Sequence, residues 1–386
     1  MAIFLVALFA ALSVGDGGLP ERNADKFDAP ALTHPFGPGT DTVLSPLARW
    51  DSIWYLSIAD SGYPDDAEAR PAFFPLYPLV VRAVAVGAGP GAQLVAAYLV
   101  SMAALLGALY LLWRLAALEL GRPLARPTLL LLVAFPASLF LGAPYAESLF
   151  LLLSVGAFYA ARTGSWAWAG VLAGLASGTR SAGILLLLPL AILWFQQPGR
   201  RPAGAAWLAL APAGLAGYAL YLEIATGDGL AFLAVQEAWG RHFAGPFGGV
   251  WEGLVAAWDG LRQVLSGTTD VVYFEQAGGD PFRVAAQNLM LFGFLALALA
   301  AAYGVLRRLP FAYGAYVVAA LALPLSFPVT PQPLMSLPRF LVVLFPIFMW
   351  LAIVCEERRI TAQVAAGSAL VLGLFVTQYA TWHFIA

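Results

Sequence analysis

The stretch that decides the fold is Arg49–Arg82, RWDSIWYLSIADSGYPDDAEARPAFFPLYPLVVR. It sets one acid, Asp51, among aromatic residues, adds a cluster of acids after Gly62, and ends in an apolar run that prolines interrupt. What this combination does depends on whether the chain lies in water or in a membrane, so the class of the protein has to be settled first.

The composition is that of a membrane protein. Of the 386 residues, 61% are hydrophobic and 11% are charged, whereas charged residues make up about 25% of a typical soluble domain. That leaves too little polar surface to cover a globule in water. Several apolar runs also approach or reach the roughly 20 residues that a helix needs to cross a bilayer. The sequence therefore predicts an all-α polytopic membrane protein.

Other classes find no support. The net charge of −2 gives no basis for nucleic-acid binding, and the single cysteine, Cys355, excludes an intrachain disulfide. The three histidines, His34, His242 and His383, lack metal-ligand spacing, and the chain has no phosphate-loop, HExxH or dinucleotide motif. We therefore expect no cofactor.

We expect about eleven transmembrane helices. The apolar opening, 2–14, is short for a span and has no basic flank or convincing cleavage site, so we interpret it as a first helix clipped by a late start codon. Ten further apolar runs follow at 92–113, 127–142, 146–162, 165–180, 183–197, 204–224, 286–306, 311–328, 339–355 and 361–383.

Arginine placement gives the orientation. Half of the basic residues lie in five short connections, and the positive-inside rule puts these turns in the cytoplasm. We thus predict a single domain, 1–386, with two large extracytoplasmic loops, 15–91 and 225–285, that contain interfacial helices. The residues in the short turns are Arg114, Arg122, Arg126, Arg162, Arg200, Arg201, Arg307, Arg308, Arg358 and Arg359.

The first outer loop contains a predicted interfacial helix, 50–60. On a helical wheel, Trp54 falls on the apolar side, Tyr55 on the opposite side, and Asp51 at the edge between them. Asp60 lies nine residues further on and out of phase, and Gly62 ends the helix. The run after Arg70 holds too many prolines to begin as a regular helix. Broken backbone at membrane depth is tolerated only against protein or a wet cavity, so we expect a re-entrant segment there.

Several ionisable residues lie inside apolar runs, near their predicted outer ends. Glu147, Arg180 and Arg339 are of this kind. Such residues are costly in lipid and normally face the interior of a helix bundle. Because arginine binds phosphate in a bidentate manner, their convergence below an acidic loop predicts a site for an anionic lipid head group.

Five motifs in sequence order carry a resemblance. They are RWDSIWYLSIADSGYP with AFFPLYPLVVR, FPASLFLGAPYAESLFLLL, GLASGTRSAGILLLLP, VQEAWGRHFAGPF and SLPRFLVVLFPIF. In this order they resemble the bacterial branch of the PIG-V mannosyltransferase family, which belongs to the GT-C superfamily of polytopic glycosyltransferases. The similarity runs from about residue 48 to residue 355.

The resemblance implies an enzyme of a GPI-anchor-like biosynthesis family. It would transfer mannose from a polyprenyl-phosphate carrier to a hydroxyl on the extracytoplasmic side, with inversion in one displacement, in a bacterial plasma membrane. Asp51 matches the essential acid that these enzymes carry in the first outer loop. The acceptor is left open among a lipid, a glycan and a protein hydroxyl.

The residue chemistry agrees with that expectation. A carboxylate such as Asp51 can accept the proton of a hydroxyl as it attacks a sugar, so it would be the general base. Cationic groups would stabilise the departing phosphate. The candidate substrate residues are Arg180, Arg339, Arg241, Glu147, Trp54 and Tyr55, with Asp60 as a possible second acid. Asp65, Asp66 and Glu68 could hold a divalent metal weakly.

Structural explanations compete with these roles. Asp51 could be a helix N-cap and Asp60 a solvated acid, while Glu147 could orient a neighbouring arginine. Arg180 and Arg339 could reach lipid head groups at the interface, and Arg241 could be an ordinary surface residue. For the aromatic run at 73–77, packing is the favoured interpretation over sugar stacking.

A multispan transporter or lipid flippase without covalent chemistry is the alternative function. Transporters commonly show repeated halves with paired broken helices, and neither half of this chain echoes the other. A subunit that has lost catalysis is a third reading, against which the retention of Asp51 argues.

Overall fold

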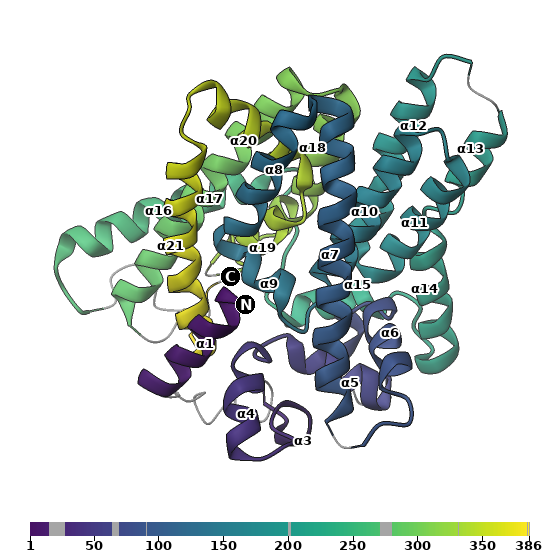
Figure 1. Ribbon diagram of the computed structural model, residues 1–386. Coiled ribbons are helices and arrows are strands. Elements are labelled where there is room, and N and C mark those ends of the chain that lie inside the picture. Colours follow the sequence, from purple (N-terminus) through teal and green to yellow (C-terminus); the bar gives the residue numbers. More distant parts are fainter. Residues whose placement is uncertain are drawn as a thin grey trace.

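The computed structural model describes residues 1–14, 28–63, 69–89, 91–199, 202–270, 280–330, 332–383 and 385. Within these ranges the chain forms helices and no named strand, apart from a single antiparallel bridge between Arg241 and Val329. Long helices stand side by side as a bundle, and short helices gather at one end of it (Figure 1). The all-α prediction is confirmed.

Every predicted apolar run coincides with a helix or with a broken series of helices. The helices are α1 (Ala2–Ser13), α7 (Ala92–Leu120), α8 (Arg122–Ala134) with η3 (Pro136–Ser138) and α9 (Leu139–Gly142), α10 (Glu147–Arg162), α11 (Trp166–Thr179), η4 (Ser181–Leu186) with α12 (Leu187–Gln196), α13 (Pro202–Leu208), α14 (Ala213–Thr226), α17 (Pro281–Arg308), α18 (Phe311–Ser326), α19 (Leu337–Val342), α20 (Phe345–Glu357) and α21 (Thr361–Ala380).

By length and composition, the described residues contain four helices able to cross a membrane, with α13 and α14 taken as one. The pair formed by α8 and the η3–α9 segment, bent by 75°, would make a fifth. Other apolar helices, such as α18, are shorter. The chain is therefore an integral membrane protein with several spans, and the number eleven stays a prediction.

The breaks have local causes. Phe135 is extended in front of Pro136, because the proline ring disfavours helical backbone in the preceding residue. Arg180 is also extended, between α11 and η4. A third break separates α19 from α20, whose first turn contains Pro346. These breaks expose backbone polar groups, which in a membrane is tolerated only within protein or along a cavity.

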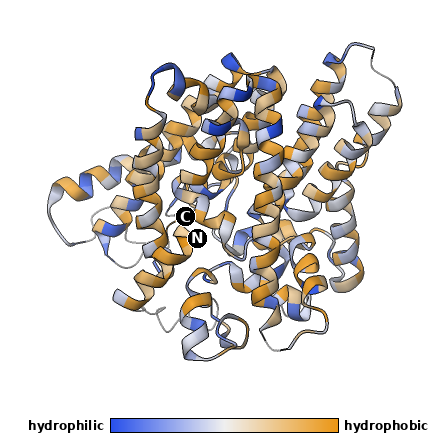
Figure 2. Ribbon diagram, in the orientation of Figure 1, coloured by the Kyte–Doolittle hydropathy of each residue, from blue (hydrophilic) through white to orange (hydrophobic). Residues whose placement is uncertain are grey.

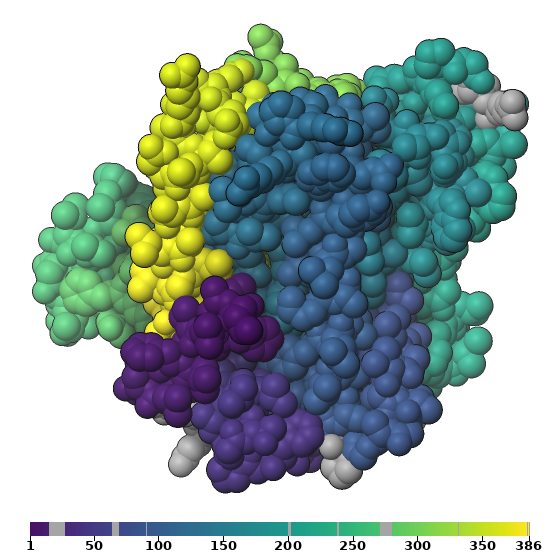
Figure 3. Space-filling view, in the orientation of Figure 1, coloured from purple at the N-terminus to yellow at the C-terminus, as the bar shows by residue number. Residues whose placement is uncertain are grey.

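The first outer loop folds against one end of the bundle, at the bottom of Figure 1 and in purple to blue in Figure 3. Its elements are α3 (Pro30–Thr33), α4 (Pro38–Leu44), η1 (Ser45–Leu47), α5 (Ser52–Ser61), η2 (Arg70–Ala72) and α6 (Leu76–Ala85). As predicted, Gly62 ends α5, with φ +79, and the proline-rich run begins with a 3-10 turn rather than a regular helix.

The exposure predicted for α5 is wrong. Tyr55 and Ala59, placed on the side away from the apolar arc, are buried, and so are Ile53 and Leu56. The helix therefore packs inside the fold on most of its sides, because neighbouring helices cover it, rather than lying with one face open to water.

The second outer loop contains α15 (Ala231–Ala238) and α16 (Gly248–Ser266). The small residues of α16, among them Gly253 and Gly260, are on its buried side, and Gly260 lies against Ala285 of α17. Large apolar side chains such as Trp251 and Trp258 are exposed. The helix projects from the flank of the bundle (Figures 1 and 3), and its exposed apolar side has the character of the predicted interfacial helix.

Charged turns lie at the end of the bundle opposite the first outer loop. Hydrophilic residues gather in the upper turns of Figure 2, while the helix bodies are mostly hydrophobic. Arg162 pairs with Glu119 near the end of α7, and Arg308 pairs with Glu357 at the end of α20, at 2.6 Å. These arginine-bearing turns are thus separated from the first large loop, and the side of the membrane that each end faces stays a prediction. Arg200 and Arg201 lie outside the described residues.

Close packing of α11 and α14 generates a test. A Cβ added at Gly214 would lie 2.2 Å from the carbonyl oxygen of Gly174 and 2.3 Å from the amide nitrogen of Gly178. We expect Gly214→Ala to force the helices apart and to cost about 1–3 kcal/mol of stability, measured as a lower thermal unfolding midpoint in detergent. Gly217→Ala, where the new Cβ meets nothing within 4 Å, should leave the midpoint unchanged. Equal shifts would contradict the close approach.

Candidate active site

Asp51 stands at the N-cap position of α5 but does not cap the helix. Its side chain makes no capping hydrogen bond. Instead, its Oδ2 accepts a hydrogen bond from Nη1 of Arg339, far away in the sequence. The carboxylate therefore belongs to a tertiary ion pair, and the N-cap explanation does not describe its use.

Arg339 is a buried guanidinium shared by two acids. Its Nη1 donates to Asp51 and its Nε donates to Oε1 of Glu147. The same Glu147 oxygen accepts from Nη1 of Arg180 at 2.6 Å. Glu147 is fully buried, and its Oε2 has no hydrogen-bond partner among the described residues. These four side chains form one continuous charge network.

Arg241 joins this network from the second outer loop. The ring of Phe340 lies 5.9 Å from its guanidinium carbon and 5.4 Å from that of Arg180. Burial lowers the pKa of Arg241 to about 10, and the nearby positive charge of Arg339 acts in the same direction. Arg241 therefore stays protonated at neutral pH, so the cluster holds three cations and two anions.

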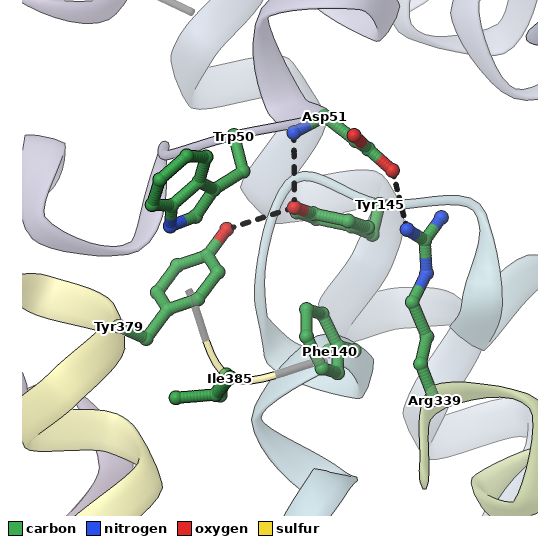
Figure 4. A pocket seen from close by; sticks show the side chains of 7 residues that line it. All are labelled: Trp50, Asp51, Phe140, Tyr145, Arg339, Tyr379 and Ile385. Carbon is green, nitrogen blue, oxygen red and sulfur yellow. Dashed lines mark hydrogen bonds and ion pairs between the residues drawn. The ribbon is translucent and has the colours of Figure 1, made fainter. Parts of the chain in front are cut away.

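Two tyrosines hold the backbone on which Asp51 is carried (Figure 4). The amide of Asp51 donates to the Tyr145 hydroxyl at 3.1 Å, and that hydroxyl donates to the Arg49 carbonyl at 3.2 Å. The Tyr379 hydroxyl lies 2.8 Å from the same carbonyl and 3.1 Å from the Tyr145 hydroxyl. Trp50, between Arg49 and Asp51 in the chain, has φ +53, a strained conformation for a non-glycine residue. The tyrosines stabilise this turn and thereby fix Asp51.

A narrow cleft opens beside Asp51. Figure 4 shows the carboxylate and Arg339 on one side and aromatic rings on the other. The lining residues are Trp50, Asp51, Phe140, Tyr145, Arg339, Tyr379 and Ile385. The cleft therefore joins an ionised pair to an apolar, aromatic wall.

The structure brings together five of the predicted site residues: Asp51, Glu147, Arg180, Arg339 and Arg241. Each one lies at a helix break or in an outer loop, which explains how residues so far apart in the sequence meet.

Trp54 and Tyr55 lie in a group of packed aromatic rings beside the charge network. Trp54 stacks on Phe73 at 5.9 Å and meets Trp239 edge-on, while Tyr55 packs edge-on against Phe73 and obliquely against Tyr145. The burial of Phe73 agrees with packing as the favoured interpretation of that aromatic run.

Asp60 is not brought to the cluster. It is exposed at the far end of α5, where its Oδ1 accepts from Gln93 at 3.3 Å. Nine helical residues separate it from Asp51, or about 13 Å along the axis. Its assignment as a second acid therefore loses its geometric basis.

Sequence reasoning missed Arg49, Tyr145 and Tyr379. Arg49 is buried, with its guanidinium 4.2 Å from the Trp382 ring. Tyr145 precedes Glu147 by two residues in the motif FPASLFLGAPYAESLFLLL, so its closeness to Glu147 in the sequence could have identified it. Tyr379 lies in the last helix, and no sequence pattern links it to Asp51.

Within the described ranges, the structure contains no group of three or more histidine, cysteine, aspartate or glutamate side chains that could hold a metal ion. The acids Asp65, Asp66 and Glu68, named above as a weak metal site, lie outside those ranges.

Broken apolar helices that enclose ionised side chains define an integral membrane protein with a sequestered polar site. The sequence profile of the family described as Mannosyltransferase (PIG-V) matches residues 2–197, about half of the chain. The chain belongs to this family, as the five motifs predicted.

Curated relatives share part of their length with this chain. The "GPI mannosyltransferase 2" of Chaetomium globosum is 34% identical over 230 residues, which cover 49% of this chain and 47% of that protein. The "GPI alpha-1,6-mannosyltransferase 2" of Cricetulus griseus is 33% identical over 197 residues, covering 48% of this chain and 38% of that protein. The chain thus spans about half or less of the length of these relatives.

Among solved structures, ArnT from Cupriavidus metallidurans bound to undecaprenyl phosphate is similar to 98% of this chain, which covers 76% of that one, with 16% identity and a TM-score of 0.44.

The shared acid generates a test of stability. Glu147→Gln removes one negative charge from a buried cluster and leaves Arg180 and Arg339 with a single anion between them. Breaking a buried ion pair costs about 3–5 kcal/mol, so we expect a markedly lower thermal unfolding midpoint. Glu357→Gln, which removes an exposed partner of Arg308, should cost less than about 1 kcal/mol. Similar losses in the two variants would show that the Glu147 network does not stabilise the fold.

Proposed function

We propose that this protein is an integral-membrane glycosyltransferase, a polyprenyl-phosphate-dependent mannosyltransferase whose general base is Asp51. The observation that carries the proposal is the pairing of Asp51 with Arg339 beside Glu147 and Arg180. Membership of the PIG-V family supports the reaction, and the names of the relatives support mannose as the sugar. The site would face outward from a bacterial plasma membrane, on the side of the large loops.

The charge count supports a donor with one phosphate. Three guanidiniums and two carboxylates sum to +1, and a sugar linked to a lipid through one phosphate is a phosphodiester with a charge of −1. The occupied site would therefore be neutral, and net charge in a low-dielectric site is costly. A pyrophosphate-linked donor would carry about one further negative charge and leave the site unbalanced.

The net charge of the occupied site would also stay at zero during the reaction. The acceptor proton passes to Asp51, so the site gains one positive charge. The released phosphate monoester approaches a charge of −2, since its second pKa is about 6. The two changes cancel, and the arginines stabilise the charge that develops on the leaving oxygen.

The geometry at Asp51 supports its role as base. Oδ2 is held by Arg339, and Oδ1 has no hydrogen bond within the described part of the chain. Oδ1 would accept the acceptor's proton while the acceptor oxygen attacks the anomeric carbon. The bond from that carbon to the phosphate oxygen breaks on the opposite face, so the configuration inverts.

The acceptor is a lipid, glycan or protein hydroxyl. The names of the relatives, which refer to GPI, favour a glycolipid of the phosphoinositide type among these three. The aromatic wall of the cleft is suited to a neutral sugar or lipid head group, because aromatic side chains combine apolar area with polar edges.

Asp51→Asn should abolish transfer while the protein folds normally. Loss of a general base lowers the rate by about 100- to 10,000-fold, which is measured with radiolabelled polyprenyl-phosphate mannose in membranes that contain equal amounts of each variant. Asp60→Asn, on the same helix but outside the cluster, should retain wild-type activity. Unchanged transfer in Asp51→Asn would remove the proposed base, and movement of the donor lipid without covalent transfer by the wild type would favour a transporter.

Arg339→Ala should impair both binding and chemistry, because this guanidinium would contact the donor phosphate and also orients Asp51. Losing a charge-assisted hydrogen bond costs about 1.5–3 kcal/mol, so we expect the donor KM to rise roughly tenfold or more and kcat to fall. Arg308→Ala, at the opposite end of the bundle, is the matched control. Equal kinetic constants in the two variants would contradict the assignment.

A further inference from the structure

Four exposed aromatic side chains form a surface between the second outer loop and α18. We call Phe243, Phe247, Trp251 and Phe327 the outer aromatic patch. Phe243 is 65% exposed and Trp251 is 68% exposed. Large aromatic side chains left uncovered on a folded chain mark a surface that contacts something apolar.

The patch is built into the fold. The rings of Phe243 and Phe327 are in contact, with centroids 5.2 Å apart. Backbone hydrogen bonds join the two segments, from Ala244 to Ser326 at 3.1 Å, and the Phe247 amide donates to the Ser326 hydroxyl at 3.2 Å. The aromatic rings are therefore held by an ordered pair of segments.

One end of the patch adjoins the cationic cluster. Nη1 of Arg241 donates to the carbonyl oxygen of Phe327 at 3.0 Å. Arg241 in turn lies over Phe340, the ring that also contacts Arg180. Arg241 thus touches both the outer aromatic patch and the ring that contacts Arg180.

The other end of the patch continues along α16. Trp251 begins an exposed stripe that follows helical spacing on the side of α16 turned away from α17. The stripe contains Trp251, Leu254, Trp258, Leu261 and Leu265. Since α16 projects from the flank of the bundle (Figure 1), this stripe continues away from the cationic cluster along that helix.

We propose that the outer aromatic patch and the α16 stripe bind the isoprenoid chain of the lipid-linked donor, with its phosphate among the guanidinium groups of Arg241, Arg180 and Arg339. This inference rests on the proposed function. A ligand with one anionic end and a long apolar body matches a surface that begins at fixed cations and continues as uncharged aromatic and aliphatic side chains. A second copy of this chain or another protein would have no need of the cationic end.

The test compares donors that differ only in their chains. Mannosyl phosphate is attached either to a C55 undecaprenyl chain or to a C10 citronellyl chain, and kcat/KM is measured for both with the wild type and with Trp251→Ser combined with Trp258→Ser. We expect the wild-type preference for the long chain to fall at least fivefold in the double variant, through the KM of the long-chain donor, with kcat unchanged. Trp168→Ser, at another exposed tryptophan, is the matched control and should keep the preference.

A chain-length preference that is unchanged in the double variant would overturn the inference. So would an equal loss for both donors, or a changed oligomeric state with both donors affected alike, which would assign the surface to a second copy. If the wild type transfers mannose from neither donor, the proposed function itself fails.

A measurement without catalysis separates the two proposals further. Undecaprenyl phosphate with a photoreactive group in its chain should crosslink to peptides within residues 243–265 of the wild-type protein. Crosslinking only to other helices would contradict the assigned path, whatever the enzymatic activity.

Discussion

The site depends on one guanidinium. Arg339 is buried and lies between two carboxylates, so it neutralises Glu147 inside the bundle and holds Asp51 at the edge of the cleft. Glu147 could not be buried in an apolar bundle without such a partner, because an isolated charge in low dielectric is costly. The second arginine on Glu147, Arg180, balances the charges of the two acids. Arg241 then gives the cluster an excess positive charge, and that excess is what prepares it for an anionic ligand.

Breaks in the helices make this arrangement possible. An unbroken span satisfies its own backbone hydrogen bonds and presents side chains around its circumference, with little freedom to gather charges at one depth. Here Glu147 starts a helix after the Pro136 bend, Arg180 lies in the extended residue between α11 and η4, and Arg339 lies in the short helix α19. The stability of the apolar bundle compensates for the irregular backbone around the polar interior.

The two large loops supply the remaining residues of the site. The first loop supplies Asp51 on a strained turn, which two tyrosines from distant parts of the chain hold in place. The second loop supplies Arg241 together with a surface of exposed aromatic rings. In this arrangement the acid comes from the first loop, two of the cations come from the broken helices, and the second loop provides both the third cation and the exposed aromatic surface.

The sequence by itself determined the class of protein, the position of the apolar helices and most of the charged residues of the site. Hydropathy is a property of consecutive residues, and an ionisable side chain within an apolar run has few places to go except a polar interior. The pairing of those charges was not available, because Asp51 and Arg339 are 288 residues apart and only the packing of broken helices brings them together. The same is true of Tyr379, whose hydroxyl reaches the Asp51 turn from the last helix, and of the burial of α5, where tertiary packing covered a face that the helical wheel had left open. Asp60 shows the converse, since its acidity is visible in the sequence while its distance from the cluster follows from the straightness of one helix.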